Sequence, residues 1–283
     1  MYRVTKALNH NAVLAIKDKG SREYLLLGKG IGFGRKVSEY IEPTEDCRIY
    51  SLSSDSERGN ARELLRDINP KYLEIADAIL DGAKQEFGKV DRGILFPLAD
   101  HIGFAVKRIR DGEKISNPLK QDIQVLFYKE YKVAALAKQL LLESDGLALD
   151  EDEIGYIALH VHSSICDEKV SGAMQIAAAV RECISLIEAD VGKNIDVQTI
   201  SYNRMMNHIK YMAARAMTGE VLKLDMNEYM EQKFPASFRI AATVCRHLEQ
   251  HLEIKLADSE IGYLAMHIER VYADESPDNA VEA

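Results

Sequence analysis

A long internal repeat is the feature that most constrains how this chain folds. The segment EIGYIALHV recurs almost unchanged as EIGYLAMHI, which places His160 and His267 107 residues apart. The same spacing separates His101 from His208 in an otherwise diverged sequence. A spacing that recurs at two places predicts a tandem duplication of one domain of about a hundred residues.

The duplicated part has the period of amphipathic helices. From about residue 61 onward, apolar residues recur at steps of three and four, and Gly, Asn-Pro and Ser-Asp-Gly segments punctuate them. We therefore expect two all-helical bundles. The expected helices lie near 71–87, 94–110, 119–143 and 151–167, and near 173–191, 199–218, 236–252 and 259–272.

The first fifty residues follow a different pattern. The segments YRVTKAL, AVLAIK, REYLLLG and CRIYSL are typical of short strands, and turn-forming residues separate them. A sheet of this size buries little surface and leaves open edges, which favours a homodimer. The expected fold class is multidomain: a small, dimeric N-terminal antiparallel β-sheet domain followed by two tandem all-α helical-bundle domains. The expected domains are 1–56, 61–168 and 172–275, with a polar linker at 53–60.

Charge is distributed unevenly between these parts. The formal net charge is −9, but residues 1–52 hold nine basic and six acidic side chains, so the rest of the chain carries −12. A basic N-terminal segment, the basic front (residues 1–52), thus precedes an acidic remainder of the chain. Long-range attraction to phosphate groups is expected from the front alone.

Other classes of protein are disfavoured. No apolar run approaches the roughly 20 residues of a membrane span, and the first residues lack a signal-peptide core, so we expect a cytoplasmic chain without membrane insertion. The four cysteines are far apart and form no CxxC, which disfavours zinc knuckles and disulfides and predicts buried free thiols. We expect no metal, no cofactor and no catalytic residues.

The repeated histidines are the main candidates for chemistry. Asp150 and Glu153 resemble a capping box that starts the helix carrying His160. The apolar pattern places His160 and His101 at the margin of buried stripes, half-buried and within reach of solvent. A single histidine there is best interpreted as a core residue, but recurrence of the pair in both copies favours a retained function.

Metal binding and covalent modification are the two functional interpretations. No cysteine or acidic ligand recurs beside the histidines except Glu153 and Glu260, which fit better as helix starts. His247 and His251 share a helix face but lack a counterpart in the first copy, and we interpret them as surface residues. A neutral imidazole is a competent nucleophile toward phosphoryl groups, and modification adds roughly two negative charges. Phosphorylation would thus make a switch.

The glycine-rich segment GKGIGFGRK does not match a nucleotide-binding fingerprint, because Phe33 stands where the third glycine belongs and no GxxxxGK[ST] occurs. A hairpin turn is the simplest interpretation. An aromatic ring for stacking, basic groups for phosphates and amides for base edges also meet the needs of RNA binding. The side chains concerned are Phe33, Lys29, Arg35, Lys36, Asn9 and Asn11.

These motifs together resemble a known family. LNHNAVLA followed by LLLGKGIGFGRK resembles the co-antiterminator RNA-binding domain of the BglG/SacY transcriptional antiterminators, and ADHI, NHIKY and the twin EIGY segments resemble its two phosphotransferase-system regulatory domains. The resemblance covers nearly the whole chain. It implies a dimeric, non-enzymatic antiterminator that grips a hairpin in the nascent leader transcript and prevents a terminator from forming.

The resemblance also implies site residues and partners. RNA contacts fall on Asn9, Asn11, Gly28, Lys29, Gly30 and Phe33, with Arg35 and Lys36 beside them. His101 and His160 would take phosphate with an inhibitory effect tied to the EIIB domain of a sugar permease. His208 and His267 would take it with an activating effect tied to the phosphocarrier protein HPr. Supporting side chains at the phosphorylation sites are Asp100, Arg108, Asn207 and Arg215.

One departure and two alternatives accompany this interpretation. Met205 and Met206 stand where the family leads us to expect an aromatic residue. A histidine phosphotransferase would need a substrate pocket and a phosphate cradle, neither of which the sequence indicates. A DNA-binding activator with the same helical domains would need a helix-turn-helix front in place of the strands.

Overall fold

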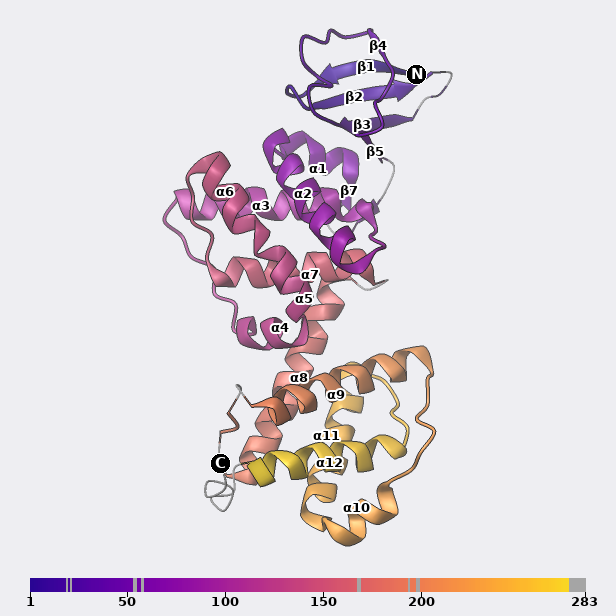
Figure 1. The fold of residues 1–283 in the computed structure, drawn as a ribbon, viewed down its shortest axis with the longest axis vertical. Helices are drawn as coiled ribbons and strands as arrows, with labels where there is room; N and C mark the ends of the chain where they lie inside the picture. The colour runs from indigo at the N-terminus through magenta and orange to yellow at the C-terminus, as the bar shows by residue number, and fades with distance from the viewer. Residues whose placement is uncertain are drawn as a thin grey trace. The chain divides into compact units, whose positions relative to one another are not determined.

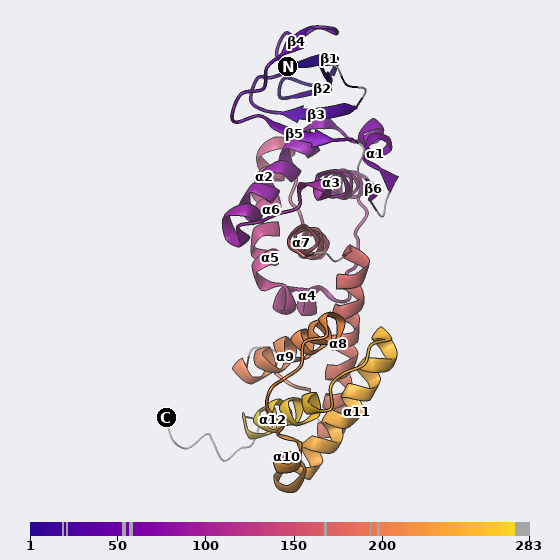
Figure 2. The ribbon, with the colours of Figure 1, turned by 90° about the vertical axis from the view of Figure 1, so that its right-hand side faces the viewer.

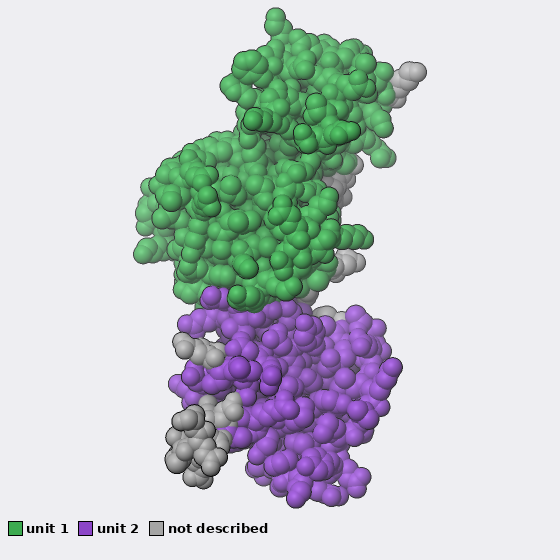
Figure 3. Space-filling model, viewed as in Figure 1, with its two compact units in different colours: residues 1–120, 127–170 green, residues 121–126, 171–283 purple. Residues whose placement is uncertain are grey.

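The computed structural model describes residues 1–18, 20, 22–52, 55–56, 59–166, 169–192, 194–196 and 199–274. Its contacts divide the chain into two compact units (Figures 1 and 3). Unit 1 holds residues 1–120 and 127–170, and unit 2 holds residues 121–126 and 171–283.

The N-terminal segment forms the expected antiparallel sheet. The sheet has five strands in the order β4-β1-β2-β3-β5, and four of them correspond to predicted strands. The missed strand, β4, is only two residues long and pairs its Ile41 with Tyr2, so it offers too little alternation to detect. The strands are β1 (Tyr2–Ala7), β2 (Ala12–Lys17), β3 (Glu23–Leu27), β4 (Tyr40–Ile41) and β5 (Arg48–Ser51).

The sheet has a small core of its own. It consists of Val4, Val13, Ala15, Leu26 and Ile41, all nearly or fully buried. Within the stretch predicted as a linker, β6 (Asp55–Ser56) pairs with β7 (Gly59–Asn60), and the other residues of that stretch lie outside the described part.

The first helical bundle of unit 1 is centred on α7 (Glu151–Ile165), which contacts α2, α3 and α5 and is seen end-on in Figure 2. The predicted helix start is confirmed, because the Asp150 side chain accepts a hydrogen bond from the Glu153 backbone N–H at 3.0 Å. The other elements are α1 (Ala61–Asp67), α2 (Pro70–Phe87), the short 3-10 helix η1 (Arg92–Ile94), α3 (Leu95–Arg110), α5 (Tyr128–Ala134) and α6 (Leu136–Asp145).

The single helix expected over 119–143 is wrong. Three helices occupy this stretch, because the chain leaves helical geometry at Phe127 and turns again at Ala135. The first of them, α4 (Lys120–Leu126), belongs almost wholly to unit 2, where the Leu126 carbonyl accepts a hydrogen bond from Lys210. The apolar spacing continues through both breaks and so conceals them.

Unit 2 repeats the arrangement of the first bundle. Its helix α12 (Ser259–Asp274) contacts α9 (Ile200–Thr218), α10 (Asn227–Lys233) and α11 (Pro235–Leu252). The spacing of 107 residues extends to helix starts, since α4 begins at residue 120 and α10 at residue 227. Helix α10 was not predicted.

The remaining helix of unit 2, α8 (Val170–Val191), is the most apolar. It contains a stretch, Val170–Asp190, whose length and hydropathy would suit a membrane span, contrary to the expectation that no run approaches that length. A core helix of a folded domain has the same properties, and Val180, Ile184 and Ile187 are buried.

The cysteine prediction holds in part. All four are free, and Cys183 and Cys245 are buried. Cys47 is only half-buried and Cys166 is exposed, because Cys166 lies just beyond the end of α7. Of the acidic C-terminal segment, residues 275–283 lie outside the described part.

Candidate functional sites

Two loops of the sheet domain form one face: the loop between β1 and β2, and the glycine-rich segment that follows β3. The Gly28 N–H donates to the Asn11 carbonyl, the Gly30 N–H to the Asn11 side-chain oxygen and the Gly32 N–H to the His10 carbonyl, each at 2.9 Å. Gly32 was not among the predicted residues. A Cβ there would lie 2.1 Å from the Asn9 carbonyl oxygen, so only glycine lets the two loops approach.

The predicted stacking and phosphate-binding groups lie on this face. Phe33 is 70% exposed and meets His10 edge-on, with ring centroids 5.2 Å apart. Lys29 and Lys36 are exposed, and Arg35 lies 3.9 Å from the Glu39 carboxylate. An exposed ring with cations around it provides a stacking platform for a base.

The two asparagines are arranged differently, because their amides contact the helical bundle of the same unit. The Asn9 and Asn11 side-chain amides donate to the two carboxylate oxygens of Glu74 on α2, at 2.7 and 2.9 Å. The Asn9 side-chain oxygen accepts from the Asn11 N–H at 2.8 Å. Both amide groups are therefore held by hydrogen bonds in this structure.

The histidines of the first bundle lie side by side. His101 on α3 and His160 on α7 have ring centroids 5.4 Å apart, and Tyr156 lies 5.9 Å from His101. The expectation that both are half-buried is wrong, since they are only 5% and 4% exposed. Neighbouring helices cover α7 on several sides, which its apolar stripe alone does not reveal.

The histidines of the second bundle repeat the pair. The ring centroids of His208 on α9 and His267 on α12 are 4.7 Å apart, and both residues are partly buried, with the His208 side chain 11% exposed. Burial, with the charge of neighbouring groups, lowers the pKa of His208 to about 3 and that of His267 to about 4. Both rings are therefore neutral at pH 7, which is the nucleophilic form.

A buried carboxylate accompanies each pair. In the first bundle Glu153 receives two hydrogen bonds from Arg108, both at 2.9 Å, and its carboxylate lies 3.2 Å from His101 Nε2. Burial would raise the pKa of Glu153, but the adjacent His101 ring and the hydrogen bonds from Arg108 hold it below its usual range.

The same cluster recurs in the second bundle. Arg215 donates to Glu260 at 2.7 and 2.8 Å, and His208 Nε2 lies 3.7 Å from Glu260. The interpretation of Glu153 and Glu260 as helix starts alone is incomplete, because their side chains turn inward to the histidines. Their recurrence at the 107-residue spacing was the signal that could have identified them.

The other predicted supporting residues lie nearby on the same helices. Asp100 directly precedes His101 on α3, and Asn207 directly precedes His208 on α9. The Asn207 amide donates to the Asn203 carbonyl at 2.8 Å, one turn earlier in the helix. Met205 and Met206, which stand where the family pattern has an aromatic residue, are fully buried. The two methionines therefore fill the core at this position.

One further histidine group deserves comparison with a metal site. His247 and His251 lie at the surface as predicted, and Glu182 on α8 contacts His247 Nε2 at 2.8 Å and His251 Nδ1 at 3.0 Å. These three side chains have ligand atoms close enough to hold a metal ion. All three are substantially exposed, and direct ion pairing already explains their geometry.

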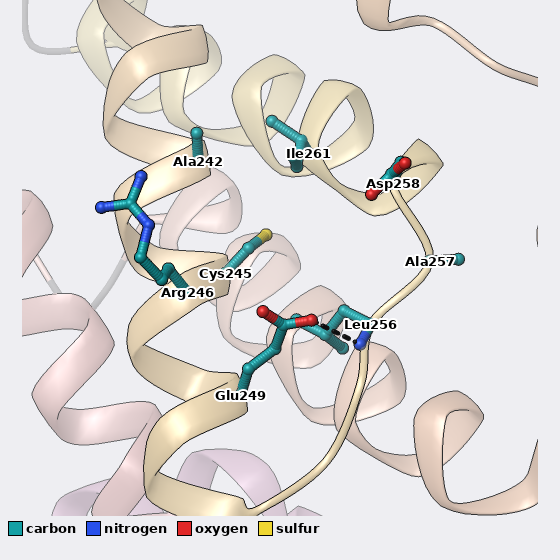
Figure 4. A pocket seen from close by; sticks show the side chains of 8 residues that line it. All are labelled: Ala242, Cys245, Arg246, Glu249, Leu256, Ala257, Asp258 and Ile261. Atoms are coloured by element: carbon teal, nitrogen blue, oxygen red, sulfur yellow. Dashed lines mark hydrogen bonds between the residues drawn. The ribbon is translucent and has the colours of Figure 1, made fainter.

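Unit 2 also contains a small pocket between α11 and the start of α12 (Figure 4). Its volume is about 180 Å³, and Glu249 on its wall accepts a hydrogen bond from the Leu256 N–H at 2.9 Å. The lining residues are Ala242, Cys245, Arg246, Glu249, Leu256, Ala257, Asp258 and Ile261. None of the four repeated histidines lines it.

Comparison with known families agrees with this layout. A family model described as a CAT RNA binding domain matches residues 2–59, and a model described as a PRD domain matches residues 73–164 and again 181–271. The chain belongs to the BglG/SacY family of transcriptional antiterminators. It therefore binds RNA in a leader transcript, and its activity is controlled through the sugar phosphotransferase system.

Relatives of this antiterminator match over nearly their whole length. Protein GlcT of Staphylococcus saprophyticus is 30% identical over 271 residues, covering 94% of this chain and 96% of the relative. The antiterminator LicT of Bacillus subtilis is 25% identical, covering 95% and 98%. A crystal structure of GlcT CAT-PRDI is 34% identical, covers 58% of this chain and 98% of its own, and has a TM-score of 0.49.

Proposed function

We propose that the face of the sheet domain formed by the two loops reads an RNA hairpin, and that the paired histidines of the helical bundles are phosphorylation sites that control it. The observation that carries the first part is that Asn11 lies on one face with Gly30 and Phe33, although 19 residues separate Asn11 from Gly30. The proposed contacts are Asn9, Asn11, Gly28, Lys29, Gly30, Phe33, Arg35 and Lys36.

RNA recognition on this face follows from its groups. The exposed Phe33 ring stacks on an unpaired base, and Lys29 and Lys36 meet phosphates. The asparagine amides read base edges when they are released from Glu74. Val37 and Tyr40 are 66% and 53% exposed beside and on the edge strand β4, which supports the proposal that a second copy covers this edge in a homodimer.

The proposed phosphorylation sites are His101, His160, His208 and His267. A phosphoryl group on His101 Nε2 would bring roughly two negative charges beside the Glu153 carboxylate, now 3.2 Å away. Repulsion separates the two groups unless Arg108 turns from Glu153 to the phosphate. Arg108, and Arg215 in the second bundle, therefore act by balancing charge. The structural change that follows phosphorylation is a movement of α3 against α7 in the first bundle, or of α9 against α12 in the second.

The proposed donors differ between the bundles. HPr phosphorylates His208 and His267 with an activating effect, and the EIIB domain of a sugar permease mediates inhibitory phosphorylation of His101 and His160. The chain acts in the cytoplasm as a regulator without catalytic turnover. The rival proposals are a histidine phosphotransferase, which requires turnover of a small phosphorylated substrate, and a DNA-binding activator, which requires a DNA-reading helix where residues 2–51 form a sheet.

The test is binding of the full chain to a short RNA hairpin with paired internal loops, across a salt series and beside a matched DNA duplex. We expect RNA-selective binding that is lost on Phe33→Ala, with Tyr128→Ala, an exposed aromatic residue of α5, as the control. Equal binding of RNA and DNA, explained by a steep salt dependence, would contradict the proposal.

A further inference from the structure

The contact between the RNA-reading asparagines and α2 lies at the centre of a larger junction. Helix α2 presents Glu74, Asp77 and Asp81, spaced three and four residues apart, along one side. The first takes both asparagine amides, and the other two receive Arg48 of strand β5. The basic front inferred from the sequence thus meets an acidic helix face.

The junction is built from partly buried groups as well as surface charges. Asp77 is 8% exposed and accepts hydrogen bonds from Tyr50 and Arg92 in addition to Arg48. The Tyr50 ring packs edge-on against Phe96 with centroids 6.2 Å apart. A buried, multiply bonded carboxylate between two guanidinium groups is strong enough to fix the orientation of the sheet on α2.

Docking on α2 affects only some of the RNA-binding groups. The Asn9 and Asn11 amides each give one of their two N–H groups to the same carboxylate, so a base edge must compete with Glu74 for these donors. Phe33, Lys29 and Lys36 stay exposed. The docked form therefore keeps its attraction for phosphate while Glu74 engages the groups that discriminate between sequences.

We propose that Glu74 is a built-in competitor for the RNA-reading asparagines, so that the sheet domain docked on α2 is an autoinhibited form and RNA recognition requires its release. This inference rests on the proposed function of Asn9 and Asn11. It adds that the first regulatory bundle acts directly on the reading groups. The apparent affinity for the specific RNA equals the affinity of the undocked form multiplied by the fraction of chains that are undocked.

The experiment compares the full chain with Glu74→Ala and a matched control, Glu86→Ala. Glu86 lies on the same helix, and its carboxylate pairs with Lys129 at 3.0 Å. Both variants therefore lose one charge, and Glu74→Ala also loses two hydrogen bonds where Glu86→Ala loses one ion pair. Affinity for the RNA hairpin and for a DNA duplex is measured for each across a salt series. Thermal unfolding confirms that both variants fold.

We expect Glu74→Ala to bind the RNA hairpin about tenfold more tightly than wild type, with duplex DNA affinity and salt slope unchanged. Glu86→Ala should match wild type for both ligands. Equal RNA affinity of wild type and Glu74→Ala would overturn the proposal. An equal gain for RNA and DNA would also overturn it, since it would show a general charge effect.

A second readout separates this inference from the function on which it rests. If the contact between Glu74 and the two asparagines holds their loop in place, hydrogen exchange at residues 8–12 should be faster in Glu74→Ala but not in Glu86→Ala. Faster exchange together with no RNA selectivity in any of the three proteins would place the failure in the proposed RNA contacts. Normal RNA selectivity with unchanged exchange and affinity would place it in the Glu74 contact.

Discussion

The two helical bundles carry the same histidine pair in different settings. In the first bundle His101 and His160 are buried, and His101 lies 3.2 Å from Glu153. In the second, the His208 side chain is slightly more exposed, at 11% against 6% for His101, and its distance to Glu260 is 3.7 Å. The duplication has kept the cluster of histidines, carboxylate and arginine while changing the distance between histidine and carboxylate.

A second pair of positions shows how the copies diverged. In the first bundle His162 Nδ1 lies 3.0 Å from Glu130, whereas at the positions 107 residues later Ser237 donates to Glu269 at 2.6 Å. The carboxylate has moved from α5 in one copy to α12 in the other. The hydrogen bond between the two helices persists although donor and acceptor helices are exchanged.

Removal of the arginine from each cluster should give the largest difference. Arg215→Ala leaves Glu260, whose side chain is 2% exposed, facing only a neutral histidine, and we expect a loss of about 3 kcal/mol in the stability of unit 2. Arg108→Ala should cost less, about 2 kcal/mol, because His101 lies closer to its carboxylate. Hydrogen exchange in α12 and α7 measures each bundle separately.

The control for this comparison is Arg110→Ala, whose guanidinium is 56% exposed and pairs with Asp145. We expect a change below about 1 kcal/mol there. Equal costs for Arg108→Ala and Arg215→Ala would show that the two clusters do not differ in their coupling to histidine.

Acid should destabilise the second bundle through its histidines. The folded pKa values of His208 and His267, about 3 and about 4, lie below the ordinary value of 6.5. Below pH 6.5 the two histidines therefore bind protons in the unfolded chain but stay neutral in the folded chain. Stability is therefore intact above pH 6.5 and falls as the pH drops toward about 4, by up to about 1.4 kcal/mol per pH unit for each histidine.

Urea unfolding of unit 2, followed by hydrogen exchange in α9 at several pH values, checks this slope. The double variant His208→Gln, His267→Gln should show a flatter dependence below pH 6.5. A slope that is unaltered in the variant would assign the acid sensitivity to other groups.

Accessibility should separate the rates of phosphorylation. With phosphorylated HPr as donor, His208 should be modified faster than His101, because its side chain is 11% exposed against 6% and its carboxylate neighbour lies farther away, at 3.7 Å against 3.2 Å. We expect a difference of about tenfold or more, since even a modest opening cost of about 1.4 kcal/mol has this effect. Time-resolved mass spectrometry of phosphohistidine peptides measures it, and equal rates would contradict the role of burial.

The exchanged polar pairs should have the smallest effect. Ser237→Ala leaves Glu269 without the hydroxyl donor, and Glu130→Gln weakens its contact with His162, each at a cost of about 1 kcal/mol. Thermal unfolding is sensitive enough to detect both. A cost above about 3 kcal/mol for either one would mean that the pair does more than join two helices.

Much of this arrangement follows from sequence alone, because duplication leaves a spacing that needs no structure to detect. The repeat predicted two bundles and singled out the four histidines whose rings the structure pairs. Burial was harder to predict, since the side chains covering His101 and His160 come from several helices at once. The inward ion pair of Glu153 was missed because a glutamate at this position also fits a capping box. The capping box already accounted for the residue, so a second role was not predicted.

Contacts between distant elements are beyond pattern analysis. Glu74 binds asparagines more than sixty residues away, and no periodicity within α2 distinguishes it from an ordinary solvent-facing glutamate. The division of 119–143 into three helices was also concealed. In the second copy Pro235 follows Phe234 and marks the matching break, whereas Tyr128 after Phe127 gives no such signal.

The central claim is that phosphorylation of the two histidine pairs controls RNA binding by the sheet. The most direct test measures RNA-hairpin affinity of the full chain before and after phosphorylation, beside the double variants His101→Ala, His160→Ala and His208→Ala, His267→Ala. We predict that phosphorylation shifts the affinity of wild type and that each double variant loses one component of the shift. An RNA affinity that is identical before and after stoichiometric phosphorylation of the histidines would contradict the account.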